Sequence, residues 1–316
     1  MSAAIVTHQL TKRYGDVLAV DALDLEVHRG EVFGFLGPNG AGKSTTIRCL
    51  LDLARPTSGR AEILGFDSRT DAIDVHRNVG YLPGDLALYD KLTGGEVLEY
   101  LANLRGGVDP AKVVELAKRF DADLSRRCGT YSSGNRQKIG LIQAFMHEPP
   151  VVILDEPTTG LDPLVQQSLH ELIESVRDEG RTVFLSSHTL SEVERVADRV
   201  AIIRHGALVV VSSISELKAR AVRRLDFEFA RPLDPELLRR VDGVREVTGG
   251  GLRWSVAYEG SVGAVLAVAT SVGVVSLRSR DADLEEIFLD YYRDTPATGA
   301  DHTRRDHEEE HADAAH

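Results

Sequence analysis

A glycine-rich loop between a strand-like segment and a helix-like segment constrains this chain more than any other feature. Val32–Leu36 is a short apolar run typical of a buried strand, residues 37–44 read GPNGAGKS, and helical spacing is expected over Thr45–Leu53. The loop fits the pattern G-x-x-x-x-G-K-[ST], whose glycines let successive backbone N–H groups point inward at the start of a helix. This arrangement predicts a phosphate loop that binds ATP or GTP.

The residue types of the loop also predict individual roles. Lys43 supplies a positive charge to the outer phosphates, and the Ser44 hydroxyl can ligate a Mg²⁺ ion that bridges them. The residues expected to contact the nucleotide here are Asn39, Gly40, Ala41, Gly42, Lys43, Ser44 and Thr45. The loop by itself does not separate an ATPase from a GTPase or a kinase.

A second motif places two carboxylates at the end of an apolar run. Val151–Leu154 reads as a buried strand and is followed by Asp155 and Glu156. Strands often end in acidic residues, so this motif means little alone. Together with an upstream phosphate loop, it predicts that Asp155 holds the Mg²⁺ shell and that Glu156 orients the attacking water. The pair favours hydrolysis over mere binding of the nucleotide.

Short apolar runs alternate with longer segments of helical spacing through the first two thirds of the chain. This alternation predicts an α/β fold with a mainly parallel core sheet and helices on both of its faces. The other expected strands are Val183–Ser187 and Val200–Arg204, and the other expected helices are Asn135–His147, Pro163–Arg177 and Ser191–Asp198.

The rhythm changes after about residue 221, where the expected elements become shorter. Their order, βαββαβ, is that of a small α+β ferredoxin-like domain, here placed over residues 221–294 after a first domain over 1–220. The elements are strands Leu225–Ala230, Val244–Thr248, Leu252–Tyr258 and Val274–Arg278, and helices Asp234–Val241, Ser261–Ser271 and, at the end, Asp283–Tyr292.

Residues 295–316 contain almost no large apolar side chain, so disorder is expected there. Four histidines beside carboxylates in this tail suggest weak metal binding, but the composition fits a solvated tail better.

Composition excludes several classes of protein. A formal net charge of −12 argues against a nucleic-acid partner, because phosphate backbones are held by clustered Lys and Arg. Cys49 and Cys128 lie too far apart for a disulfide framework or a usual zinc site, which fits a reducing cytoplasm. No signal-peptide pattern is found over Met1–Gln9, and the longest apolar stretch, Val262–Leu277, is too short and too interrupted to span a membrane. A cytoplasmic chain is therefore expected.

Four segments carry a resemblance to a known family. Residues 37–46 read GPNGAGKSTT, 131–145 read YSSGNRQKIGLIQAF, 151–163 read VVILDEPTTGLDP, and 185–194 read LSSHTLSEVE. Together they closely resemble the ATPase cassette of ABC transporters over roughly residues 4–220. The resemblance implies a phosphate-loop cassette with a helical subdomain, and it implies ATP and Mg²⁺ as cofactors.

The resemblance also implies roles for residues outside the phosphate loop. Tyr14 corresponds to the aromatic residue that stacks on adenine, with a buried tyrosine as the alternative. Ser132 and Gly134 begin the signature sequence, which contacts the γ-phosphate held by the other subunit. Asp162 belongs to the loop that crosses to the partner, and His188 is the switch histidine on the γ-phosphate. The implied catalytic residues are therefore Glu156, His188 and Lys43.

Two departures from the family pattern bear on activity. Gly84 stands where a glutamine that reaches Mg²⁺ is usual, and the neighbouring Asp85 is a hypothetical substitute metal ligand. Ser133 and Asn135 replace the usual glycine and glutamine of the signature. If Gly84 abolished turnover, the chain would be a nucleotide-binding regulator.

Without a membrane span, such a cassette can drive transport only through a separate membrane permease. The resemblance implies contact through a helical insert between Leu86 and Ser125, a second copy of the chain in an ATP-sandwich dimer, and a place at the cytoplasmic face of the membrane. The chain looks most like bacterial ABC-2 type exporters of the daunorubicin and tetronasin type, which implies export of a drug, antibiotic or other hydrophobic compound. An importer remains an alternative. ABC ATPases that act on ribosomes or DNA are another, although neither a second cassette nor a coiled-coil insert is found.

Overall fold

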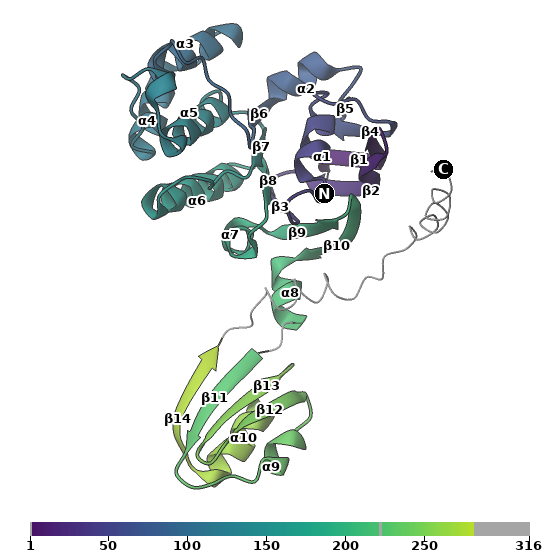
Figure 1. Cartoon of the computed structure of the whole chain (residues 1–316), viewed down its shortest axis with the longest axis vertical. Coiled ribbons are helices and arrows are strands. Elements are labelled where there is room, and N and C mark those ends of the chain that lie inside the picture. Colours follow the sequence, from purple (N-terminus) through teal and green to yellow (C-terminus); the bar gives the residue numbers. More distant parts are fainter. Residues whose placement is uncertain (1, 221–222, 281–316) are drawn as a thin grey trace, which may run out of the picture.

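The computed structural model describes residues 2–220 and 223–280, and a six-stranded sheet forms the centre of the first part (Figure 1). The order of the strands is β10-β9-β3-β8-β7-β6, and all neighbours pair in parallel except β10 with β9. The predicted mainly parallel core sheet is therefore confirmed. The strands are β3 (Val32–Leu36), β6 (Val79–Leu82), β7 (Val151–Asp155), β8 (Thr182–Ser187), β9 (Arg199–Arg204) and β10 (Ala207–Ser213).

A second, antiparallel sheet of four strands comes mainly from the N-terminus and has the order β2-β1-β4-β5. It was not predicted from the sequence. Gln9 and Ala22 have φ angles of 47° and 43°, and register shifts interrupt the pairing of the two long strands. Such bulges break the alternation of apolar and polar residues by which strands are recognised. The strands are β1 (Ala3–Tyr14), β2 (Val17–His28), β4 (Ser58–Ile63) and β5 (Phe66–Asp67).

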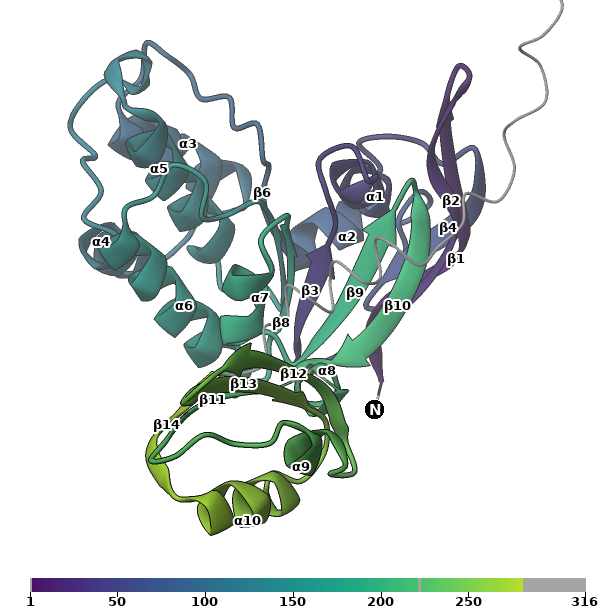
Figure 2. The ribbon, with the colours of Figure 1, turned by 60° about the horizontal axis from the view of Figure 1, so that its bottom comes forward.

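Helices cover both faces of the parallel sheet and create two cores (Figure 2). Phe33 and Phe35 of β3 point into the core shared with α1, α2 and the antiparallel sheet, whereas Val32 and Leu36 point into the core shared with the remaining helices. This explains why β3 is apolar at nearly every position. The helices are α1 (Lys43–Leu50), α2 (Ala72–Asn78), α3 (Gly94–Leu104), α4 (Pro110–Arg119), α5 (Ser133–Phe145), α6 (Pro163–Asp178), α7 (Leu190–Val196) and α8 (Ile214–Arg220).

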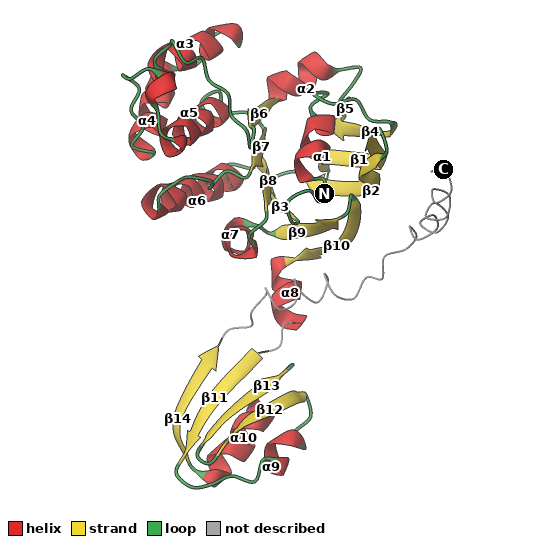
Figure 3. Ribbon diagram, in the orientation of Figure 1, coloured by secondary structure: helices red, strands yellow, loops and turns green. Residues whose placement is uncertain are grey.

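Helices α3, α4, α5 and α6 gather on one side of the parallel sheet, away from the antiparallel strands (Figure 3). Thr93 and Glu96 form a capping box that fixes the start of α3, and Asp109 caps α4 ahead of Pro110. Two helices thus lie in the insert that the sequence placed between Leu86 and Ser125. Over residues 2–220 and 223–280, none of the helices has the length and apolar character needed to cross a membrane.

Several helix boundaries differ from the predicted ones by up to three residues, and the physical reason is clear at α1. The helix begins at Lys43, two residues earlier than expected, because Gly42 with a φ of 109° forms its N-terminal boundary. It ends at Leu50 rather than Leu53, and Asp52 in the left-handed region with a φ of 51° turns the chain away.

The described part of the C-terminal region has the predicted βαββαβ order. Its antiparallel sheet runs β12-β13-β11-β14, and α9 and α10 pack on one side of it around Phe227, Phe229 and Val256 (Figure 2). The elements are β11 (Arg223–Phe229), α9 (Glu236–Arg239), β12 (Val244–Gly250), β13 (Arg253–Tyr258), α10 (Gly263–Val272) and β14 (Val274–Arg280). The predicted helix Asp283–Tyr292 and the tail 295–316 lie outside the described residues, and the domain limits at 220 and 294 stay predictions.

Candidate functional site

The glycine-rich loop lies where the sequence placed it, between the end of β3 and the start of α1. Lys43 is 5% exposed, and its Nζ donates to the carbonyl of Gly37 at 2.7 Å and to that of Pro38 at 3.3 Å. A Cβ on Gly42 would lie 2.4 Å from the Ala19 carbonyl oxygen, so a side chain is excluded there. The loop therefore wraps around the lysine ammonium and leaves its backbone N–H groups at the helix N-terminus.

The other loop residues differ in exposure along the segment. Asn39 and Gly40 are exposed, and Gly40 has a φ of 80° that favours glycine. Ala41 is buried, whereas Ser44 and Thr45 of the first helical turn are half-buried. The tip of the loop is thus open to a ligand while its base is packed.

Both predicted carboxylates lie at the end of β7. Asp155 is 3% exposed, and its Oδ1 accepts a hydrogen bond from the Ser186 hydroxyl of the neighbouring strand β8. Glu156 follows with a φ of 50°, a conformation that is uncommon for a residue with a side chain. Its N–H donates to the Ser186 carbonyl at 3.2 Å, which fixes this turn against β8.

The structure brings three predicted catalytic side chains together. Glu156 Oε1 lies 3.1 Å from Lys43 Nζ, and Glu156 Oε2 lies 2.7 Å from His188 Nδ1. Lys43 and Glu156 are largely buried, whereas His188 is 52% exposed. The carboxylate therefore sits between the phosphate-loop lysine and a histidine that faces solvent, as an acceptor that can hold a water or a proton donor.

A glutamine that was not among the predicted site residues supports the turn at Glu156. Gln137 of α5 is 7% exposed, and its Nε2 donates to the carbonyls of Glu156 at 3.4 Å and Pro157 at 3.0 Å. It thereby links α5 to the strained turn. The detectable signal is a glutamine on the helix face that also carries the buried Gly140, Leu141 and Ala144.

A second missed residue is Glu192 of α7. Its Oε1 accepts from the Thr158 hydroxyl and its Oε2 from the Ser187 hydroxyl, both at 2.7 Å. The same Ser187 Oγ accepts from the backbone N–H of Thr189 at 2.9 Å. These bonds connect the segments on either side of His188 to the loop after Glu156.

Gly84, the position of the missing glutamine, packs directly against Asp155. A Cβ there would lie 3.3 Å from both Cγ and Oδ2 of Asp155. Burial, assisted by the charge of Asp155, raises the pKa of the nearby Tyr81 to about 12, so Tyr81 stays neutral. Asp85 is exposed, and over the described residues no cluster of three His, Cys, Asp or Glu side chains with metal-binding geometry is found.

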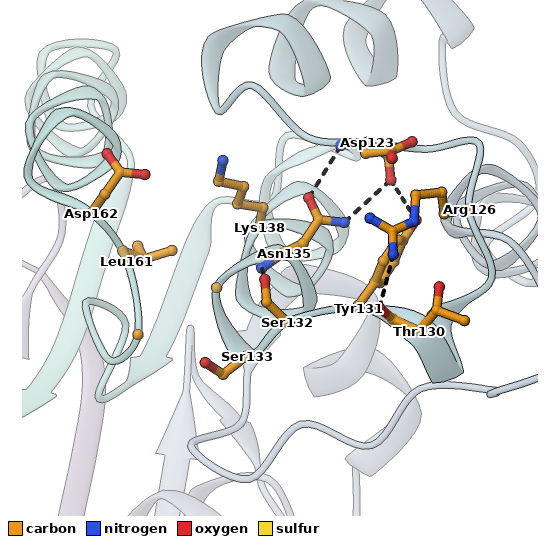
Figure 4. A pocket seen from close by; sticks show the side chains of 12 residues that line it. Asp123, Arg126, Thr130, Tyr131, Ser132, Ser133, Asn135, Lys138, Leu161 and Asp162 are labelled. Carbon is orange, nitrogen blue, oxygen red and sulfur yellow. Dashed lines mark hydrogen bonds between the residues drawn. The ribbon is translucent and has the colours of Figure 1, made fainter.

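The signature residues line a separate pocket of about 530 Å³ (Figure 4). Ser132 caps α5, and its Oγ accepts from the Asn135 N–H at 3.2 Å. The Asn135 amide holds the peptide of Asp123, accepting from its N–H at 3.1 Å and donating to its carbonyl at 3.2 Å. The helix thus begins at Ser133, two residues before the start predicted from the sequence. The lining of the pocket also includes Ser133, Gly134, Gly160, Leu161 and Asp162. It contains no residue of the phosphate loop.

The first turn of α5 and the loop at residues 158–162 meet at one edge of this pocket. A Cβ on Gly134 would lie 2.6 Å from the Gly160 carbonyl oxygen, so the two backbones touch. Asp162 caps α6, and its Oδ1 accepts from the N–H groups of Leu164 at 3.1 Å and Val165 at 3.0 Å. The signature helix and the loop that ends at Asp162 thus present one continuous surface.

Tyr14 lies at the end of β1, near the hairpin to β2. Its side chain is 46% exposed, so the alternative of a buried tyrosine is wrong. Lys12 Nζ stands over its ring at 4.7 Å from the centroid. An exposed aromatic face is available here for stacking.

Several known proteins are similar to this chain. Residues 20–159 match the family model described as ABC transporter. The bacitracin transport ATP-binding protein BcrA of Enterococcus faecalis is 37% identical over 231 residues, which cover 72% of this chain and 75% of that protein. The daunorubicin resistance ATP-binding protein DrrA3 of Streptomyces coeruleorubidus is 41% identical over 221 residues, which cover 68% of this chain and 70% of that one.

A solved structure, of an ATP-binding subunit of an ABC transporter, superposes with a TM-score of 0.63. It is 30% identical, and the match covers 68% of this chain and 92% of that chain.

The contact between Gly134 and Gly160 generates a prediction. Gly134→Ala is expected to push the loop at residues 158–162 away from α5 and to lower the free energy of unfolding by about 1–3 kcal/mol, because the added Cβ would meet a backbone carbonyl oxygen that cannot change rotamer. Urea unfolding and hydrogen exchange of the loop measure both effects. Gly250→Ala, whose Cβ would meet nothing within 4 Å, is the matched control. Unchanged exchange in Gly134→Ala would contradict this account of the contact.

Proposed function

Because the chain belongs to the ATP-binding subunits of ABC transporters, a family of ATPases, we propose that it powers export of a drug, antibiotic or other hydrophobic compound through a separate membrane permease. The proposed ATP hydrolysis rests on one observation, the contact of Glu156 with both Lys43 and His188 beside the phosphate loop. The proposed export is supported by the relatives that are named for bacitracin transport and daunorubicin resistance.

We propose the following roles for the chain's own residues in hydrolysis. The loop N–H groups and the Lys43 ammonium bind the phosphates, which draws Lys43 away from Glu156. Glu156, held by its strained turn and by Gln137, then orients the attacking water and accepts its proton. The His188 imidazole, which contacts Glu156, donates a hydrogen bond to the γ-phosphate. Tyr14 stacks on the adenine.

We propose that Mg²⁺ binds between the phosphate loop and the end of β7, where the side chains offer the oxygen atoms that this ion prefers. The Ser44 hydroxyl and the Asp155 carboxylate are hard oxygen ligands, and Asp155 is buried with one oxygen left over from its bond to Ser186. When bound, the ion neutralises charge on the phosphates. We propose Asp85 as a further, solvent-mediated ligand that stands in for the glutamine absent at Gly84.

Removal of this carboxylate tests its role. Asp85→Ala is expected to raise the Mg²⁺ concentration for half-maximal ATP hydrolysis several-fold, because a ligand to the ion is lost. A phosphate-release assay over a Mg²⁺ titration measures this, with the exposed Asp90→Ala as control. An Mg²⁺ dependence and a rate equal to those of the unmodified chain would show that Asp85 is not a ligand.

We propose that two copies of the chain sandwich ATP between them. The signature pocket has no phosphate-loop residue in its lining, so Ser132 and Gly134 are free to meet a nucleotide held by another copy. The helix N-terminus of α5 offers N–H groups to a γ-phosphate. Asp162, at the rim of the same pocket, lies where the loop would approach the second subunit.

This arrangement predicts how loss of the general base changes assembly. Glu156→Gln is expected to bind ATP without hydrolysing it and therefore to accumulate as a dimer at saturating ATP. Light scattering after size exclusion measures the mass, and Lys43→Ala, which lacks the phosphate contact, is expected to stay monomeric. A Glu156→Gln chain that is monomeric at saturating ATP would contradict the sandwich.

We propose that the permease binds at the insert with α3 and α4 and places the chain at the cytoplasmic face of the membrane. The tagged chain is then expected to co-purify from detergent-solubilised membranes of its own organism with one polytopic membrane protein, identified by mass spectrometry. Cells carrying Lys43→Ala are expected to lose tolerance to the exported compound. Accumulation of a nutrient by the wild-type pair, without any change in drug tolerance, would indicate import instead.

A further inference from the structure

Tyr14, which is proposed to stack on adenine, is in contact with Lys12, a residue that has no role in the proposed hydrolysis. Lys12 of β1 lies two residues before Tyr14, so both side chains are on the same face of the strand. Its ammonium stands 4.7 Å from the centre of the Tyr14 ring, which is within the range of a cation–π contact. One face of the ring is therefore covered and the other is left for stacking.

The same ammonium is fixed from a second direction. Lys12 Nζ donates to the Arg55 carbonyl at 2.7 Å, in the segment that connects α1 to β4. Thr57 ties this segment to β1 on both sides, since its N–H donates to the Thr11 carbonyl at 2.7 Å and its Oγ1 accepts from the Arg13 N–H at 2.9 Å. Lys12 is thus bonded to a backbone segment that is itself hydrogen-bonded to β1.

The connection leads back to the phosphate-binding helix. Helix α1 begins with Lys43 and ends seven residues later, where Cys49 and Leu50 are buried in the core behind β1. The residue before Arg55 donates its N–H to the carbonyl of Arg48 in the last turn of α1 at 3.0 Å, so the segment that holds Lys12 is bonded to the helix. One ammonium therefore links the aromatic ring on the hairpin with the end of the helix that binds phosphate.

We propose that Lys12 is a positioning residue that presents the Tyr14 ring to the adenine of the bound nucleotide, at a fixed place relative to the phosphate loop. An exposed tyrosine at a hairpin end loses rotamer freedom when a base stacks on it. The contact with Lys12 removes that freedom before the nucleotide arrives. Lys12 itself touches neither base nor phosphate in this proposal, which rests on the nucleotide site proposed above.

The test compares a ligand with adenine to one without it. ADP and inorganic pyrophosphate, both with Mg²⁺, are titrated into the full chain by calorimetry, so that hydrolysis does not interfere. Lys12→Met keeps the aliphatic stem and is expected to weaken ADP about three- to tenfold. The pyrophosphate affinity is expected to stay within about twofold, which also shows that the variant is folded.

Two variants serve as controls for charge and for chemistry. Lys12→Arg is expected to bind ADP nearly as well as the unmodified chain, because a guanidinium can also lie on the ring and donate to the Arg55 carbonyl. Arg13→Met removes the same charge from the exposed neighbouring position and is expected to leave ADP binding unchanged.

The decisive comparison is made in a Tyr14→Ala chain, where Lys12→Met is expected to have no further effect on ADP. Equal weakening of pyrophosphate by Lys12→Met, or weakening of ADP that persists without the tyrosine, would overturn the proposal in favour of a direct contact. If Tyr14→Ala weakens ADP but Lys12→Met does not, only the role of Lys12 fails. If Tyr14→Ala leaves ADP affinity unchanged, both the role of Lys12 and the proposed stacking of Tyr14 on adenine fail.

Discussion

The contact between the Lys43 ammonium and the Glu156 carboxylate depends on two strand ends that the parallel sheet holds at one edge. Lys43 follows β3 and Glu156 follows β7, and β8 lies between these strands and pairs with both. Because the carboxyl ends of parallel strands meet at the same edge, two distant parts of the sequence come within 3.1 Å of each other. The phosphate loop, the buried Asp155 and His188 after β8 all share this edge.

Close packing of main chain, rather than bulky side chains, shapes the surfaces around this edge. Gly42 lies against the Ala19 carbonyl, Gly134 against the Gly160 carbonyl, and Gly84 against the Asp155 side chain. At each position a methyl group would meet atoms at 3.3 Å or less, and at the first two those atoms are backbone. Because Gly84 has no side chain, the segment after β6 packs closely against the Asp155 carboxylate, which is expected to hold the metal.

Two polar side chains, on α5 and α7, connect these helices to the edge of the sheet where Lys43 and Glu156 meet. Gln137 reaches from α5, the helix that starts the signature pocket, to the carbonyl of Glu156. Glu192 joins the loop after Glu156 to the strand end before His188. One amide side chain therefore couples the position of α5 to the turn at Glu156.

The sequence by itself determined the α/β class, the phosphate loop, the acidic strand end and the βαββαβ order, because each depends on local residue spacing. Through resemblance it also predicted roles for Tyr14, Ser132, Asp162 and His188, and these roles stay predictions. Only the tertiary structure decided that Glu156 contacts both Lys43 and His188, that Gln137 and Glu192 support them, and that Lys12 covers one face of Tyr14. These contacts join residues that are far apart in the chain or depend on side-chain direction. The antiparallel sheet escaped prediction because its bulges break the periodicity by which strands are recognised.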